Sequence, residues 1–249
     1  MRDVRASRGG PKQKPVYEAE KLRDIIVFAL VFCSLPFIFR RPYIGILVWS
    51  WLAYMNPHRL TWGIAYTFPF SMVVGITMIV AVAISPEPKR IPWTPVTIAW
   101  LFFFLWTALT TQFALAPYGA AIEWSRWWKI CLISVFTLMI MGARQRLELL
   151  VWVVSLSLGF YGVKGGIFAL FTGSGFMIYG PPNSFVSDTT SLALALIMVF
   201  PLTWYLYLEA RNRWIKSGLL AAMLLISEGF ARSRCSAIAP VLDGIVSAT

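Results

Sequence analysis

The chain has 249 residues, of which 58% are hydrophobic and only 13% are charged, and its net charge is +11. A water-soluble domain cannot cover so much apolar surface, so the composition excludes that class and indicates an all-α, polytopic transmembrane helical bundle. At about 20 residues for each span, the length allows about 7–8 spans. One histidine, three cysteines without a CxxC pair, and no phosphate-binding glycine motif predict that the protein uses no metal, no cofactor and no nucleotide.

The predicted elements begin after a basic segment, residues 1–23, in which Gly9-Gly10-Pro11 and Pro15 favour a flexible tail. The apolar run that follows has no cleavage motif and leads directly to another span, so we do not expect it to be a cleaved signal peptide. Apolar runs bounded by prolines, glycines and charges then predict spans at residues 25–39, 43–55, 68–85, 95–113, 120–141, 148–171, 189–208 and 214–231.

Lys and Arg in the short connections predict the orientation of these spans. The connections at Lys89-Arg90, Arg144/Arg146 and Arg211–Lys216 are basic, and they alternate with connections that are poor in charge. The basic set is expected on the cytoplasmic side, which accounts for the excess of positive charge without nucleic-acid binding. Alternation places the N-terminus outside, whereas its basic tail favours the inside. Either the first two short spans form a re-entrant pair or the tail overrides the alternation.

Charged residues inside the apolar runs gather on the predicted external side. Glu123, Arg126 and Lys129 share one face of the fifth span because they are three residues apart. Further charges in this leaflet are Lys164, Asp188, Glu228, Arg232 and Arg234. A charge within a bilayer is costly and therefore indicates function. Anchoring at the interface is the alternative for Arg126 and Lys129, which neighbour tryptophans, and helix capping is the alternative for Asp188.

Several cations in a medium of low dielectric constant suit a diphosphate, and a lipid diphosphate carries its headgroup at this depth. The cations would stabilise the departing diphosphate without a metal. Transfer to a hydroxyl also needs a general base, for which Asp188, Glu123 and His58 are all available.

Five segments resemble the O-antigen ligase-like proteins associated with the exosortase A system, known as O-glycosylation ligases. The resemblance covers about residues 22–234. It is carried by Tyr54–Gly63, Pro88–Pro95, Ser157–Phe168, and the Gly180–Asp188 loop leading into Leu192–Pro201.

This resemblance implies a glycosyltransferase of the bacterial inner membrane, with several spans. Its partners would be a polyprenyl-diphosphate-linked glycan, such as one on undecaprenyl diphosphate, and an acceptor protein or surface polymer on the periplasmic side. In this chain Arg126, Lys129, Lys164 and Arg234 would bind the lipid diphosphate, and Arg59 and Glu123 would line the mouth of the pocket. The catalytic residue stays open between His58 and Asp188.

The chain departs from the family pattern at three places. Residues 1–22 look like an extension, and Thr189-Thr190 replace two asparagines. After Ser233-Arg234 the family continues with a large periplasmic loop that carries catalytic His and Arg, whereas residues 235–249 form an atypical tail. We therefore expect residues 24–234 to be the N-terminal transmembrane domain of a truncated ligase-like protein, which lacks much of the catalytic apparatus.

Two other classes of protein remain as alternatives. A transporter or flippase for a lipid-linked or anionic solute predicts charges in the middle of the membrane and an inverted repeat, and neither pattern is visible in the sequence. A non-catalytic membrane remnant is the third hypothesis.

Overall fold

The computed structural model describes residues 14–61, 63–86, 91–172, 180, 184 and 186–227, and within these ranges the side chains of all residues except 14–21, 60, 126, 169 and 172. The described elements are all helices, without strands. They are α1 (Lys14–Arg40), α2 (Pro42–Met55), the 3-10 helices η1 (Pro57–Leu60) and η2 (Ile64–Tyr66), α3 (Phe70–Ile84), α4 (Pro95–Gln112), α5 (Pro117–Ile140), α6 (Arg144–Thr172), α7 (Thr189–Glu209), and a last helix over residues 213–227.

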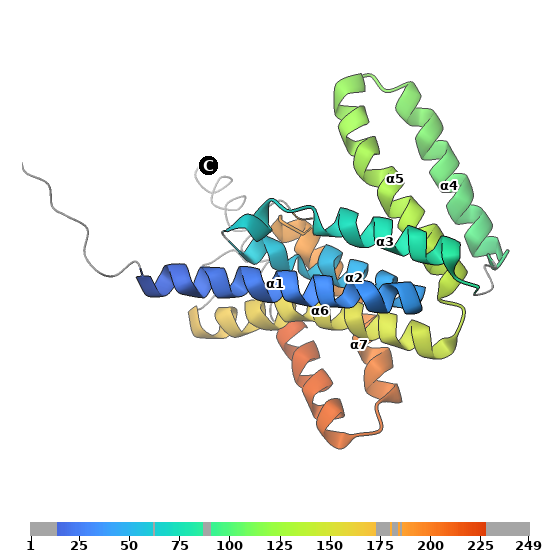
Figure 1. The fold of residues 1–249 in the computed structure, drawn as a ribbon. Coiled ribbons are helices and arrows are strands. Elements are labelled where there is room, and N and C mark those ends of the chain that lie inside the picture. The colour runs from blue at the N-terminus through green and yellow to red at the C-terminus, as the bar shows by residue number, and fades with distance from the viewer. Residues whose placement is uncertain are drawn as a thin grey trace, which may run out of the picture.

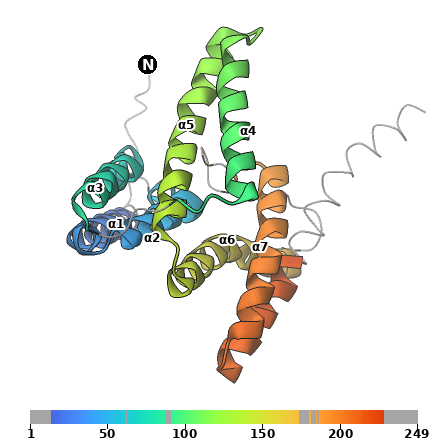
Figure 2. The ribbon, with the colours of Figure 1, turned by 90° about the vertical axis from the view of Figure 1, so that its right-hand side faces the viewer.

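Four helices form the centre of the molecule, and two hairpins extend from it. Helices α1, α2, α3 and α6 lie side by side, as Figures 1 and 2 show. The α4–α5 hairpin points away on one side, and the hairpin of α7 and the 213–227 helix points away on the other (Figure 1).

The larger core lies where α1, α2, α3 and the second half of α5 meet. Its fully buried side chains include Val31 and Ile38 of α1, Ile46 of α2 and Met78 of α3. Gly45 allows α2 to approach α3 closely, because a Cβ there would lie 2.8 Å from Cγ of Met78. A second core joins α6 and α7 to the 213–227 helix through Leu158, Tyr161, Leu192, Leu196, Val199 and Ile226.

Local sequence accounts for the helix boundaries. Arg41 is extended, as expected before a proline, and Pro42 begins α2, where its missing N–H costs no hydrogen bond. Thr94 caps α4 by accepting a hydrogen bond from the backbone N–H of Thr97 at 3.3 Å. Asn56 ends α2 in the left-handed conformation, with φ of 45°.

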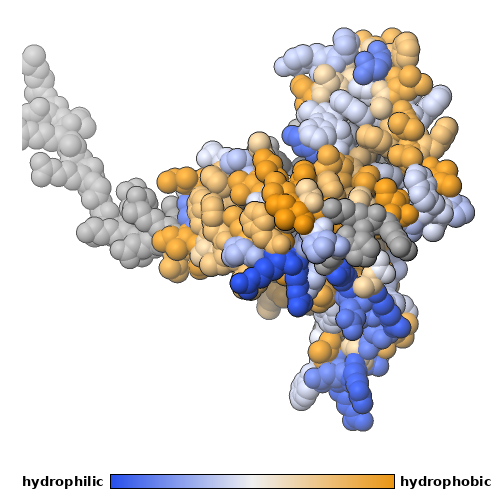
Figure 3. Space-filling view, turned by 45° about the vertical axis from the view of Figure 1, so that its right-hand side comes forward, coloured by the Kyte–Doolittle hydropathy of each residue, from blue (hydrophilic) through white to orange (hydrophobic). Residues whose placement is uncertain are grey.

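Four of the described helices are long and apolar enough to cross a membrane, by length and composition. They are Leu22–Arg40, Pro95–Gln112, Arg144–Phe168 and Thr189–Glu209. Helices α2 and α3 have 14 and 15 residues, fewer than the about 20 that a perpendicular span needs. The apolar exterior in Figure 3 fits a membrane protein.

Hydroxyl side chains in these helices bond to the preceding turn of their own helix. Thr107 donates to the carbonyl of Phe103 at 2.8 Å, Ser157 to that of Val153 at 2.6 Å, and Thr203 to that of Val199 at 3.0 Å. Such bonds satisfy polar groups where lipid offers no partner.

Candidate functional site

The loop between α2 and α3 folds back onto the bundle and brings together polar groups from three helices. Asn56 starts this loop, and its side-chain amide donates to the carbonyl of Ala53 at 2.7 Å. Thr61 then donates to the carbonyl of His58 at 2.7 Å. These bonds shape the loop locally, and η1 and η2 contact α1. We call this end of the molecule the His58 end.

His58 lies inside this loop, with 8% of its surface exposed. Its ring is 5.9 Å from the ring of Phe70, and its Nδ1 has no hydrogen-bond partner among the described residues. Burial lowers the pKa of the imidazole, and the positive charge of Arg59 lowers it further. The imidazole is therefore neutral at pH 7, and its Nδ1 is buried.

Arg59 is half-buried beside it, and its guanidinium lies 5.0 Å from the centroid of the Tyr66 ring. A guanidinium over an aromatic face is stabilised electrostatically, and the N–H groups along the edge of the guanidinium can still donate hydrogen bonds. Within the described part of the chain, no carboxylate forms a salt bridge with Arg59.

Asp24 of α1 completes the loop site and was missed by the sequence analysis. Its half-buried carboxylate lies against Gly63, where a Cβ would be 2.9 Å from Cγ of Asp24. Its Oδ1 is buried without a hydrogen-bond partner among the described residues. The signal in the sequence was an acidic residue at the start of a long apolar run. A charge within a bilayer is energetically costly and therefore indicates a function.

Helix α6 reaches the same end through Tyr161, whose hydroxyl donates a hydrogen bond to the backbone carbonyl of Met55, the last residue of α2. Lys164 follows one turn later on α6 and is exposed. The structure therefore brings the helix that carries Lys164 to the loop that carries His58 and Arg59.

The other predicted site residues within the described part of the chain come from α5 and from the residue before α7. Glu123 and Lys129 are exposed on α5, in the hairpin that points away from the bundle, and the Lys129 ammonium lies 5.9 Å from the Trp128 ring centroid. Asp188 precedes α7, is exposed, and makes no side-chain capping bond. The Arg126 side chain and the whole of Arg234 lie outside the described residues.

The opposite end of α2 and α6 carries basic groups, and we call it the Arg144 end. Arg144 contacts Glu148 at 2.8 Å and Glu209 at 3.1 Å. The guanidinium of Arg146 lies 4.8 Å from the Tyr43 ring centroid and donates to the carbonyl of Ile140 at 3.1 Å. The connections at residues 40–41, 141–143 and 210–212 therefore meet at one end, as the alternation of basic loops predicts.

The described residues contain no group of three His, Cys, Asp or Glu side chains that could hold a metal ion. The loop itself offers the Arg59 guanidinium to an anion and the His58 imidazole to a proton, and Lys164 follows the contact of Tyr161 with Met55 by one turn of α6.

The fold and the composition of its helices define an all-helical protein of the kind that resides in membranes. The model of a protein family, described as a family of unknown function (DUF5935), matches residues 22–211, and the chain belongs to this family. No curated protein and no solved structure matches the chain.

Proposed function

We propose that this chain is part of a multi-pass glycosyltransferase of the bacterial inner membrane. It would act on a glycan carried by a polyprenyl diphosphate and transfer it to a protein or surface polymer at the periplasmic face. The observation that carries this proposal is the buried, neutral imidazole of His58 beside the Arg59 guanidinium, at the end opposite to Arg144.

In this proposal seven or eight helices cross the membrane. Helices α2 and α3 are short, but they pack against the longer α1 and α6 and can cross in a bilayer that is thinned locally around them. The basic Arg144 end faces the cytoplasm, because Lys and Arg concentrate there in short connections. The His58 end then faces the periplasm, where a lipid diphosphate presents its glycan.

Arg59 and Lys164 bind the diphosphate. Guanidinium groups bind phosphate oxygens in a bidentate manner, and both cations stabilise the negative charge that develops as the diphosphate leaves. Arg126, Lys129 and Arg234 are retained as further phosphate ligands, and Glu123 as a residue of the pocket mouth.

His58 is the general base of the transfer. The hydroxyl of the acceptor attacks the anomeric carbon, the bond from that carbon to the diphosphate oxygen breaks, and the hydroxyl proton moves to the imidazole. A neutral His58 is ready for this step at pH 7, since it already lacks the proton it must accept. Asp188 is the second candidate base, and its exposed carboxylate lies in the connection before α7.

The test is binding by the whole chain in nanodiscs that contain excess phosphatidylglycerol, which saturates general sites for anionic lipids. Undecaprenyl diphosphate should bind the wild type, and Arg59→Gln or Lys164→Met should each weaken binding by about tenfold, as expected for one charged hydrogen bond of about 1.5 kcal/mol. Lys216→Gln, at the opposite end, should leave binding unchanged.

His58→Gln should retain diphosphate binding, and in a full-length relative the same substitution should abolish transfer from a glycosylated polyprenyl diphosphate to an acceptor. Equal binding by the wild type, Arg59→Gln and Lys164→Met would sink the proposal. Uptake of the lipid-linked glycan by proteoliposomes without transfer would identify a transporter instead.

A further inference from the structure

The turn between α7 and the 213–227 helix carries three basic residues that have no acidic partner within the described part of the chain. They are Arg211, Arg213 and Lys216. The nearest acid in the sequence, Glu209, is engaged by Arg144 at 3.1 Å. The tip of this hairpin therefore carries a concentrated positive charge. Figure 3 shows a hydrophilic surface there, at the bottom of the view.

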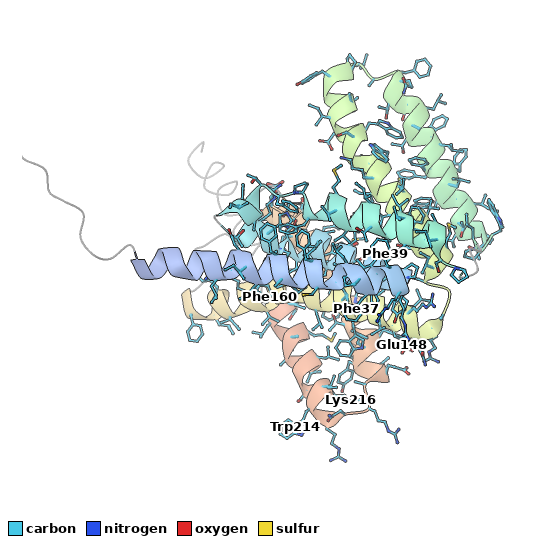
Figure 4. All side chains as sticks on the ribbon, in the orientation of Figure 1. Phe37, Phe39, Glu148, Phe160, Trp214 and Lys216 are labelled. Atoms are coloured by element: carbon cyan, nitrogen blue, oxygen red, sulfur yellow. The ribbon has the colours of Figure 1, made fainter. Side chains whose placement is uncertain are left out.

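The same turn also exposes large apolar and aromatic side chains. Trp214 is 84% exposed, Leu208 is 59% exposed and Ile215 is 42% exposed. The Lys216 ammonium lies 5.6 Å from the centroid of the Tyr207 ring. Figure 4 shows Trp214 and Lys216 projecting from the end of this hairpin.

We propose that residues 208–216 form a binding site for the headgroups of anionic phospholipids in the leaflet at the Arg144 end. Arg211, Arg213 and Lys216 contact the lipid phosphates, while Trp214 and Ile215 enter the boundary between headgroups and acyl chains. This site is separate from the loop that carries His58, and it does not depend on the proposed transferase activity.

The combination of charges and apolar groups favours lipid over other anionic partners. A nucleic acid or an acidic protein segment would satisfy the cations but leave Trp214 and Ile215 in water. A lipid leaflet satisfies both sets, because its phosphates lie directly above an apolar layer. Each basic side chain near an anionic membrane surface strengthens binding by about fivefold.

The experiment counts lipids bound to the whole chain by native mass spectrometry, in mild detergent titrated with dioleoylphosphatidylglycerol or dioleoylphosphatidylcholine. The wild type should prefer the anionic lipid. The triple variant Arg211→Gln, Arg213→Gln, Lys216→Gln should lose at least about tenfold of that preference. A matched triple variant with the same loss of charge at the start of α1, Lys14→Gln, Lys21→Gln, Arg23→Gln, should keep it.

Two further arms keep the result decisive. Trp214→Ala should weaken binding of both lipids and leave their ratio unchanged. The single variant Arg213→Gln should lose part of the preference for the anionic lipid, and it replaces the triple variant if that variant folds poorly. Soluble glycerol phosphate should not compete with the anionic lipid. An unchanged preference in the triple variant, an equal loss in the matched variant, or full competition by glycerol phosphate would each overturn the proposal.

Discussion

The hydroxyl of Tyr161 bonds to the backbone carbonyl of Met55, which lies 106 residues earlier in the chain. Met55 is the last residue of α2, so its carbonyl belongs to the final turn, which lacks partners within the helix. The bond therefore satisfies an end group of α2 and fixes α6 beside the loop of the candidate site.

Replacing Tyr161 by Phe should remove this bond with almost no change in volume. We expect a loss of about 1 kcal/mol of unfolding free energy and a drop of roughly 2–4 °C in Tm. Thermal unfolding of the purified protein in detergent measures the change. The control is Tyr118→Phe, because Tyr118 is 83% exposed and should tolerate the loss of its hydroxyl.

Gly63 and Asp24 should show strong energetic coupling. Gly63→Ala places a methyl group against the Asp24 carboxylate and should destabilise the protein by about 1–3 kcal/mol through overpacking. Asp24→Ala removes the obstructing group, so Gly63→Ala should cost less than about 0.5 kcal/mol in that background. A double-mutant cycle of unfolding free energies tests the contact, and additive costs would contradict it.

Gly166 of α6 should tolerate substitution poorly. A Cβ there would lie 2.9 Å from the carbonyl carbon of Leu225, and backbone cannot rotate away as a side chain can. Gly166→Ala should therefore cost about 1–3 kcal/mol. Gly218 has open space around it, so Gly218→Ala should stabilise its helix by roughly 0.5–1 kcal/mol. Chemical denaturation compares the two variants, and equal effects would exclude close packing at Gly166.

His58 should make stability depend on pH. Burial lowers its pKa in the folded protein below the ordinary value of 6.5. Between these two pKa values the unfolded chain therefore binds more protons than the folded protein. The contribution of His58 to stability is complete above pH 6.5 and is lost as the pH falls through the lowered pKa of the folded protein. Tm measured between pH 7.5 and 5 should fall more steeply in the wild type than in His58→Gln.

The sequence predicts every described helix longer than one turn, because apolar runs separated by prolines and glycines mark each of them. The largest difference is at the start of α1, which begins at Lys14, inside the predicted flexible tail. Pro15 was interpreted there as a helix breaker, but proline is tolerated in the first turn, and Glu18 to Lys21 favour helix.

The number of spans was harder to predict than the helices themselves. Helix α2 has 14 residues, fewer than the about 20 of a perpendicular span, and it packs between α1, α3 and α6. A prediction from apolar runs counts such a short helix as a span, whereas length and composition select four of the described helices.

The candidate site was predicted in part. Lys164 was selected as a charge inside an apolar run, His58 as an available imidazole, and Arg59 from the family resemblance. The three residues lie on elements that meet at one end. Asp24 was missed because its significance comes from contact with Gly63, a residue of another element, and no local pattern encodes that contact.

Only 6% of the α4 residues are buried, although the helix carries no charged residue. Its side chains contact few other residues of the chain. Substitutions there should therefore be limited by the hydrophobicity of the side chain and not by its shape. Exchanges among Leu, Phe, Val and Trp along α4 should be nearly neutral, whereas the fully enclosed Ile38 and Met78 should accept few replacements. A mutational scan of the chain should therefore separate a tolerant α4 from a constrained central bundle.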